Sequence, residues 1–339
     1  MTVPTLKRTV KLTAMRSMRA AGVYSFKAKS AQRSQSLLIL CYHGIALRDE
    51  HEWAGHLFIT PERFRQRLTA LRDLKANVLP LGEGFTRLRN GSLPERAVSI
   101  TFDDGFYDFA QYAAPILSDF AFPSTLYWTT YYSERKLPII NLILDYLLWK
   151  VKQASIEFSE QGIANPMPIR NWIERRDVVH KLLAWFDSAR LDTAAKDQFA
   201  RRLANRFQID YDDILHSRIL QIMTPEEAAV LVRSDVDIQL HTHRHRTPVD
   251  RGLFAKEIED NSERIQAITG KTPVHFCYPS GVTDPAFLPW LNNCGVQTAT
   301  TCQRGFARPD SGNLLLPRVL DDSNMDPVEF EGVVSGLFA

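Results

Sequence analysis

The chain has 339 residues, of which 45% are hydrophobic, 24% charged and 10% aromatic, and these values exclude a disordered or fibrous protein. The net charge is +2, but residues 1–36 contain eight Lys or Arg and no acid, so the rest carries 33 basic and 39 acidic residues, a net charge of −6. Such an acidic body argues against a nucleic-acid-binding core, and no apolar run reaches the ~20 residues of a membrane span.

The basic N-terminal arm, residues 1–36, contains a weakly amphipathic, cationic pattern over residues 4–27. This pattern predicts a helix that makes peripheral contact with a membrane surface. A tail without fixed structure and an Arg-rich transit peptide are the alternatives. The four cysteines lack metal-type spacing and no secretory apolar segment is visible. We therefore expect reduced thiols in a cytoplasmic protein, with peripheral contact at the inner membrane surface.

Seven candidate strands alternate with helical patterns from residue 37 onwards. They are residues 37–42, 77–81, 97–102, 124–129, 236–240, 274–278 and 296–300. Helices are expected after Thr60, near 107–120, after the capping box at Thr224, at 253–269 and at 285–293. Strands separated by helical crossovers imply a parallel sheet, and seven or eight of them favour an α/β fold, a distorted (β/α)7-8 barrel related to the TIM barrel.

A long segment with few strand patterns, residues 133–223, interrupts this alternation. Its helical periodicity predicts a helical insertion beside the mouth of the barrel. The predicted organisation is an arm (1–36), a barrel (37–132 and 224–339) and the insertion between the two parts of the barrel.

Ionisable residues follow the carboxyl ends of the predicted strands. His43 follows the first strand, Asp103 and Asp104 end the third, and the run His241-Thr242-His243-Arg244-His245 follows the fifth. In isolation Asp-Asp-Gly is typical of a turn. Because the carboxyl ends of parallel strands meet on one face of a barrel, these side chains together predict a site.

His241 and His245 are spaced so that both rings can face one point, and a carboxylate from the third strand would complete a three-ligand set. Two histidines and one aspartate suit Zn²⁺, with Co, Ni, Mn or Fe as alternatives. His243 projects differently and is expected to face a neighbouring side chain or solvent.

Three motifs in this order resemble the polysaccharide deacetylases of the NodB-homology type, carbohydrate esterase family 4. They are Thr101-Phe102-Asp103-Asp104-Gly105, His241-Thr242-x-x-His245 and Tyr278-Pro279-Ser280-Gly281. The resemblance covers residues 37–132 and 224 to about 320. It implies a NodB-like barrel that binds one divalent metal and hydrolyses acetyl groups on sugars.

The resemblance also implies roles for individual residues. Asp103 would be the general base, and Asp104, His241 and His245 the metal ligands. The turn Tyr278, Pro279, Ser280 and Gly281 would contact the substrate, with the Ser280 N–H as a donor to the oxyanion. Tyr278 as a buried strand residue is the alternative.

Two departures from the family pattern affect the mechanism. Cys277 stands where an arginine usually orients the base, and no histidine follows His275 to act as general acid. Arg318, in a Leu-Pro-Arg segment, and His43, in Tyr-His-Gly, resemble replacements found in the bacterial exopolysaccharide-associated subgroup. A surface salt bridge for Arg318 and a strand-end histidine without catalytic role are the alternatives.

The sequence therefore predicts metal-dependent hydrolysis of N-acetyl groups on amino sugars of a polysaccharide or glycoconjugate, with a lipid-linked sugar as one form of the substrate. A hydrolase of the same fold acting on a non-sugar amide or an O-acetyl ester is an alternative. So is a catalytically degenerate glycan-binding protein, which would lack the metal.

Overall fold

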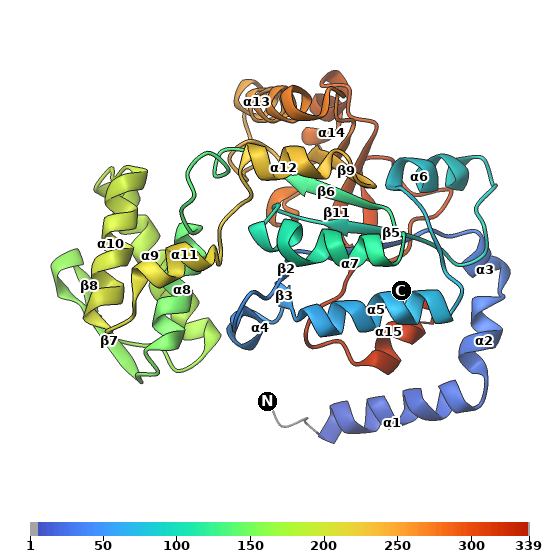
Figure 1. Cartoon of the computed structure of the whole chain (residues 1–339), viewed down its shortest axis with the longest axis horizontal. Coiled ribbons are helices and arrows are strands. Elements are labelled where there is room, and N and C mark those ends of the chain that lie inside the picture. The colour runs from blue at the N-terminus through green and yellow to red at the C-terminus, as the bar shows by residue number, and fades with distance from the viewer. Residues whose placement is uncertain (1–5, 338–339) are drawn as a thin grey trace.

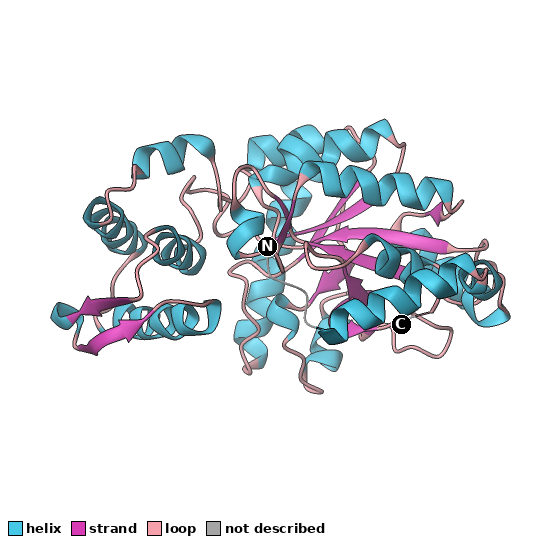
Figure 2. Ribbon diagram, turned by 90° about the horizontal axis from the view of Figure 1, so that it is seen from below, coloured by secondary structure: helices cyan, strands magenta, loops and turns pink. Residues whose placement is uncertain are grey.

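The computed structural model describes residues 6–337, and its centre is a closed ring of seven parallel strands (Figures 1 and 2). The ring order is β1, β12, β11, β10, β9, β6 and β5, and β5 pairs again with β1. Their bounds are β1 Leu38–Tyr42, β5 Ala97–Phe102, β6 Ser124–Trp128, β9 Val236–Leu240, β10 His275–Cys277, β11 Thr298–Arg304 and β12 Leu316–Leu320. The predicted α/β barrel is confirmed.

The strand β12 was not predicted from the sequence, whereas the predicted strand at 77–81 is only the two-residue β4, Asn77–Val78, outside the ring. A proline inside β12 weakens its strand pattern. The pairing of Leu40 with Val319 nevertheless places β12 between β11 and β1, so β12 closes the barrel.

Helices cover the outside of the ring and carry its parallel crossovers. Their bounds are α5 Pro61–Asp73, α6 Leu81–Arg89, α7 Ala114–Asp119 after a π-helical turn at Phe109–Ala113, α12 Pro225–Leu231, α13 Arg251–Thr269, α14 Phe287–Asn293 and α15 Pro327–Val334. The predicted capping box at Thr224 is present, since its hydroxyl accepts from the N–H of Glu227 and the Glu227 carboxylate accepts from the N–H of Thr224. A short β2 (Gly44–Ile45) pairs with β3 (Phe58–Ile59) beside α4, Glu50–Trp53.

Between β6 and β9 the chain forms a separate group of elements at the left of Figure 1. They are α8 Ile140–Lys150, β7 Ser155–Phe158, β8 Ile163–Pro168, α9 Trp172–Ser188, α10 Thr193–Arg206 and α11 Tyr211–Ser217. The antiparallel pair β7–β8 was not expected in a purely helical insertion. The boundaries of arm, barrel and insertion stay predictions.

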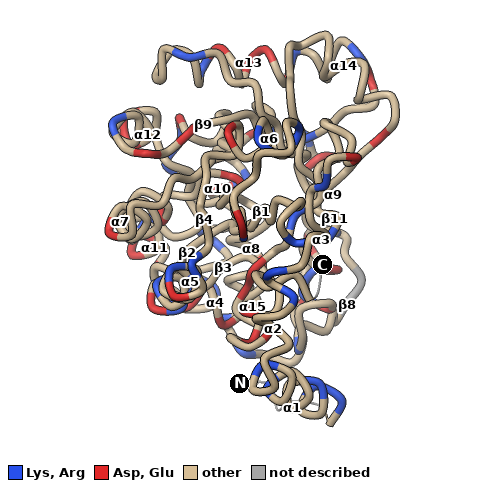
Figure 3. The backbone as a smooth tube through the Cα atoms, turned by 90° about the vertical axis from the view of Figure 1, so that its right-hand side faces the viewer, with Lys and Arg blue, Asp and Glu red and all other residues tan. Residues whose placement is uncertain are grey.

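The basic arm folds as three helices, α1 Leu6–Ala20, α2 Val23–Ala28 and α3 Ala31–Ser34, rather than as one helix over 4–27. Gly22, at φ 77°, ends the first helix. Basic residues lie along α1 (Figure 3) and pair with acids of α15: Lys11 with Glu329 at 2.7 Å and Arg19 with Glu331 at 2.5 Å. The arm is therefore packed on the barrel, although residues 1–5 lie outside the described part.

All four cysteines are free thiols. Among the described helices, none has the length and apolarity needed to cross a bilayer.

The turn after β5 depends on Gly105, whose φ is 81° and whose position would bring a Cβ within 2.3 Å of the Trp128 indole. Gly105→Ala should therefore lower the free energy of unfolding by about 2–4 kcal/mol, because strain at positive φ adds to overpacking. Urea unfolding followed by circular dichroism measures the change.

Gly91→Ala is the matched control for this glycine. Gly91 also has a positive φ, 65°, but nothing lies within 4 Å of its added Cβ. The control should cost only about 1 kcal/mol. Equal losses for the two variants would contradict a contact between residue 105 and Trp128.

Candidate active site

One cavity of about 260 Å³ opens at the carboxyl ends of the strands. Seven of the predicted site residues line it: His43, Asp103, Asp104, His241, His245, Tyr278 and Ser280. The opposite wall is apolar. It is formed by Leu57, Phe106, Ile139, Leu142 and Ile222. The predicted gathering of polar side chains at one face of the barrel is thus present in the structure.

Asp104 faces the two histidines of the second motif. Its Oδ1 lies 3.1 Å from Nε2 of His241 and 3.1 Å from Nε2 of His245. A positive φ of 67° at Asp104 turns its carboxylate away from that of Asp103. The ligand atoms of these three residues all lie within 4.8 Å of one another, as one cation would require.

The hydrogen bonds of His241 fit a metal ligand. Its Nδ1 lies 2.9 Å from the Cys277 carbonyl oxygen, which can only accept, so Nδ1 carries a proton and a metal would be bound through the Nε2 lone pair. That lone pair faces the Asp104 oxygen at 3.1 Å. Two acceptors at this separation repel unless a proton or a cation lies between them. The donor set therefore fits a divalent cation such as Zn²⁺.

Asp103 binds an arginine of β12, which is separated from β5 in the ring only by β1. Arg318 Nη1 donates to Oδ1 and Nη2 to Oδ2, both at 2.7 Å, and Arg318 is 2% exposed. Burial alone would raise the pKa of Asp103, but the charge and hydrogen bonds of Arg318 hold that pKa well below its usual value. The pair is buried, so the alternative of a surface salt bridge is wrong.

Two thiols complete the surroundings of Asp103. Cys277 Sγ lies 3.4 Å and Cys41 Sγ 3.6 Å from Oδ2 of Asp103. Arg318 Nη2 also lies 3.1 Å from the Cys277 sulfur. Burial raises the pKa of both thiols well above its usual value, which keeps them neutral. The small Cys277 side chain leaves room for the Arg318 guanidinium beside the carboxylate.

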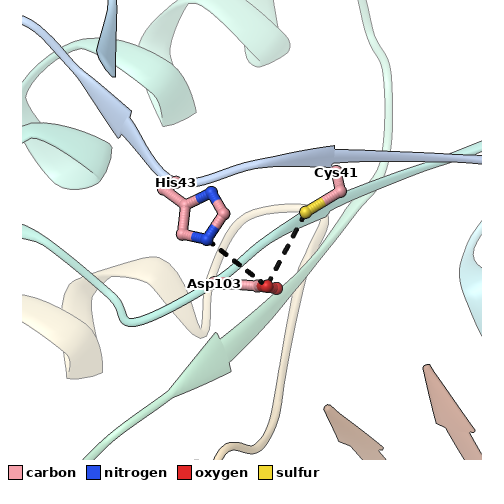
Figure 4. A group of neighbouring side chains, drawn as sticks. All are labelled: Cys41, His43 and Asp103. Atoms are coloured by element: carbon pink, nitrogen blue, oxygen red, sulfur yellow. Dashed lines mark hydrogen bonds and ion pairs between the residues drawn. The ribbon is translucent and has the colours of Figure 1, made fainter. Parts of the chain in front are cut away.

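His43 lies on the cavity wall between β1 and β2 (Figure 4). Its Nε2 is 3.8 Å from Oδ2 of Asp103. Its Nδ1 is buried and has no hydrogen-bond partner among the described residues. An unsatisfied buried ring nitrogen in a cavity is uncommon in a purely structural histidine.

The third motif forms the turn Pro279–Gly281. Ser280 has a positive φ of 55°, and a Cβ at Gly281 would come within 2.8 Å of Cys302. The Tyr278 hydroxyl donates to the Leu314 carbonyl oxygen at 3.0 Å, and Tyr278 is 1% exposed. Its hydroxyl is therefore occupied within the protein, while its ring contributes to the cavity wall.

Two residues of α13 that the sequence analysis did not single out hold the histidine loop. Asn261, fully buried, accepts from the His241 N–H at 2.9 Å and donates to the Trp128 carbonyl at 2.9 Å. Glu257, 1% exposed, accepts from the Arg244 N–H at 2.7 Å and from Nε of Arg246 at 2.7 Å. The spacing of buried polar residues four apart on a helix was the available signal.

His243 faces a neighbouring side chain, as expected. Its Nδ1 lies 2.9 Å from the Thr130 hydroxyl, and the residue is buried. Burial and the nearby Arg264 and Arg244 lower its pKa to about 4. His243 is thus neutral near pH 7 and belongs to the support of the loop.

A comparison with protein families matches part of the chain to one family. Residues 192–299 match the family model for polysaccharide deacetylase. This match confirms the resemblance to the polysaccharide deacetylases. The matched part includes the second and third motifs, whereas the aspartates of β5 lie outside it. No curated protein matches the chain.

Solved structures share the fold across most of the chain. A Streptococcus pyogenes deacetylase, PplD, in complex with acetate is 19% identical with a TM-score of 0.57, over 87% of this chain and 96% of its own. IcaB from Ammonifex degensii is 18% identical, TM-score 0.55, over 90% and 97%. A de-N-acetylase from Aggregatibacter actinomycetemcomitans is 15% identical, TM-score 0.53, over 87% and 98%. Each of these likenesses shows a shared fold.

Arg318→Met should make the stability of the barrel depend on pH in the opposite sense to the wild type. Asp103 has a depressed pKa when folded, so it stabilises the wild type above the unfolded carboxyl pKa, about 4, and this contribution is lost as pH falls. Without Arg318, burial raises the Asp103 pKa and leaves an unpaired charge at neutral pH, at a cost of about 3–5 kcal/mol. Urea unfolding at pH 7.5 and pH 5 measures both effects.

The matched variant is Arg318→Lys, which keeps a positive charge and should recover part of the loss at pH 7.5. The deficit of Arg318→Met relative to wild type should shrink at pH 5. A deficit that is the same at both pH values, or no difference between Lys and Met, would show that Arg318 acts by packing alone.

Proposed function

We propose that this protein is a metal-dependent deacetylase that removes N-acetyl groups from amino sugars of a polysaccharide or glycoconjugate. One observation carries the proposal. Asp104, His241 and His245 form a three-ligand set with a free Nε2 lone pair at His241, and the adjacent Asp103 lies in the same cavity without belonging to that set. A divalent cation bound there, Zn²⁺ in this proposal, would polarise the acetyl carbonyl and lower the pKa of a water.

The residues of the chain would move the protons. Asp103, held ionised by Arg318, would take a proton from the attacking water on its Oδ2, the oxygen that faces His43. His43 would give a proton to the amine nitrogen as the carbon–nitrogen bond breaks, which releases acetate and a free amino sugar. The Ser280 N–H is proposed as a donor to the oxyanion, with Pro279 and Gly281 setting the turn.

Arg318 would act through Asp103 as a positioning residue. Its two parallel hydrogen bonds fix the plane of the carboxylate. This contact supports the proposal that Arg318 replaces the arginine that the family usually carries at the position of Cys277.

Asp103→Asn should lower the rate of acetate release by about 10²–10⁴-fold, because the amide cannot accept the proton, while zinc content stays at one ion per chain. Acetate release from chitooligosaccharides and elemental analysis of the purified protein measure the two quantities. Release from acetylated xylan or small cyclic amides instead of chitooligosaccharides would favour the ester or non-sugar alternatives. A wild type free of divalent metal would favour the binding-protein alternative.

His43→Ala should also abolish most turnover and leave the metal content unchanged. His43 is the acid candidate because its Nε2 faces Asp103 and its Nδ1 has no hydrogen-bond partner among the described residues, and it lies outside the Asp104, His241, His245 set. Loss of metal in parallel with turnover would instead make His43 a ligand.

We also propose that residues 1–36 contact an anionic membrane surface from the cytoplasmic side, where a lipid-linked sugar would be accessible. Support comes from α1, where Leu6 and Val10 are 82% and 62% exposed on one side of the helix, and from Phe26, which is 77% exposed. Several basic residues of α1 are already paired with α15, so the apolar side chains would supply much of the attraction.

Replacing Leu6 and Val10 together by Ser in the full chain should reduce pelleting with phosphatidylglycerol-containing liposomes several-fold. Val249→Ser, at an equally exposed apolar residue that is 74% exposed on the barrel, is the control and should pellet as the wild type does. Identical pelleting of all three proteins would rule out membrane contact through α1.

A further inference from the structure

A second cavity of about 160 Å³ lies next to the catalytic one. It is formed between the loop after β6, with Tyr131, Tyr132 and Arg135, and α10, which contributes Lys196 and Asp197. Such a space suits one sugar-sized group and is too small for a folded segment or a peptide.

The two cavities are neighbours that share one residue. Tyr132 lines both of them, and the consecutive Ile139 and Ile140 line the first and the second. The N–H of Ile139 donates to the Leu220 carbonyl oxygen at 2.8 Å, which ties the loop to the returning end of the insertion. A ligand that extends from the first cavity past Tyr132 would therefore reach the second cavity next.

The residues that line the second cavity carry both donors and acceptors, and several have aromatic rings. The Arg135 guanidinium lies 4.0 Å from the centre of the Tyr131 ring and donates to the Tyr131 carbonyl at 3.0 Å, which leaves other N–H groups of its fork available. The Lys196 ammonium has a long contact of 3.4 Å to Asp187. Asp197 accepts from the Tyr211 hydroxyl at 2.6 Å and retains further acceptor capacity.

This combination favours a sugar over other ligands. Hydroxyl groups of a pyranose both donate and accept, and the ring carries an apolar face that packs on aromatic side chains. A phosphate would find Asp197 among its neighbours, and a cation would find Arg135 and Lys196. Neither a purely anionic nor a purely cationic ligand matches the lining.

We propose that this second cavity is a sugar subsite of the insertion, which binds a pyranose of the same glycan chain beyond the residue that is deacetylated. The proposal rests on the deacetylase function proposed above and narrows its substrate to glycans longer than a disaccharide. Because the lining comes from the insertion and the loop before it, the insertion would set the preference for chain length.

The test measures binding by isothermal titration calorimetry to the full-length, zinc-loaded protein carrying Asp103→Asn to prevent turnover. The probes are β-1,4-linked N-acetylglucosamine oligomers of two and five sugars. The pentamer should bind about tenfold more tightly than the dimer, as one added charge-assisted hydrogen bond with ring packing would give. Lys196→Ala and, separately, Arg135→Ala should remove most of this difference while the dimer affinity stays the same.

Lys181→Ala is the matched control, since Lys181 is also a lysine of the insertion paired with an aspartate, Asp177, and does not line the cavity. It should keep the preference for the pentamer. Equal affinities of dimer and pentamer for the starting protein, binding of neither, or equal weakening of both by Lys196→Ala would overturn the subsite.

Acetate release from the pentamer by the zinc-loaded wild type separates the two proposals. Release from the pentamer without a length preference in binding would leave the deacetylase and remove the subsite. A length preference without any release would support a glycan-binding subsite and remove the deacetylase.

Discussion

The buried pair of Arg318 and Asp103 joins the last strand of the barrel, β12, to β5, more than two hundred residues earlier in the chain. Two buried charges are costly unless both are fully hydrogen-bonded. Here both carboxylate oxygens accept from the guanidinium, and the remaining N–H groups donate to the Thr301 carbonyl, the Thr101 hydroxyl and the Cys277 sulfur. The same ion pair thus links β12 to β5 and keeps the proposed base ionised. Losing either Arg318 or Asp103 would leave the other as a buried, unpaired charge.

The two neighbouring aspartates can have different roles because the backbone separates them. Asp103 ends the regular strand and points into the barrel toward Arg318, whereas Asp104 takes a positive φ and points toward the two histidines. Repulsion between the two carboxylates is reduced because each has its own partners. These are Arg318 for Asp103, and His241 and His245 for Asp104. The Gly105 that follows permits this turn directly beneath Trp128.

The segment between β6 and β9 shapes the access to this site. Its ends supply Ile139, Leu142 and Ile222 to the apolar wall of the catalytic cavity, and its helix α10 forms part of the second cavity. The barrel therefore provides the chemical groups, while the insertion provides the surfaces that a bound glycan would meet on either side of Tyr132. This separation is common where a rigid scaffold carries variable connecting segments.

Local patterns in the sequence determined the parallel strands, the capped helices and the placement of His43, Asp103, Asp104, His241 and His245 at strand ends, since these follow from periodicity and from the geometry of parallel sheets. The strand β12 was not predicted because a proline interrupts its pattern. Only the tertiary structure decided that Arg318 binds Asp103, that Asn261 and Glu257 hold the histidine loop, and that the Tyr278 hydroxyl is already occupied. These contacts depend on which strands become neighbours when the ring closes, and no local propensity encodes that choice.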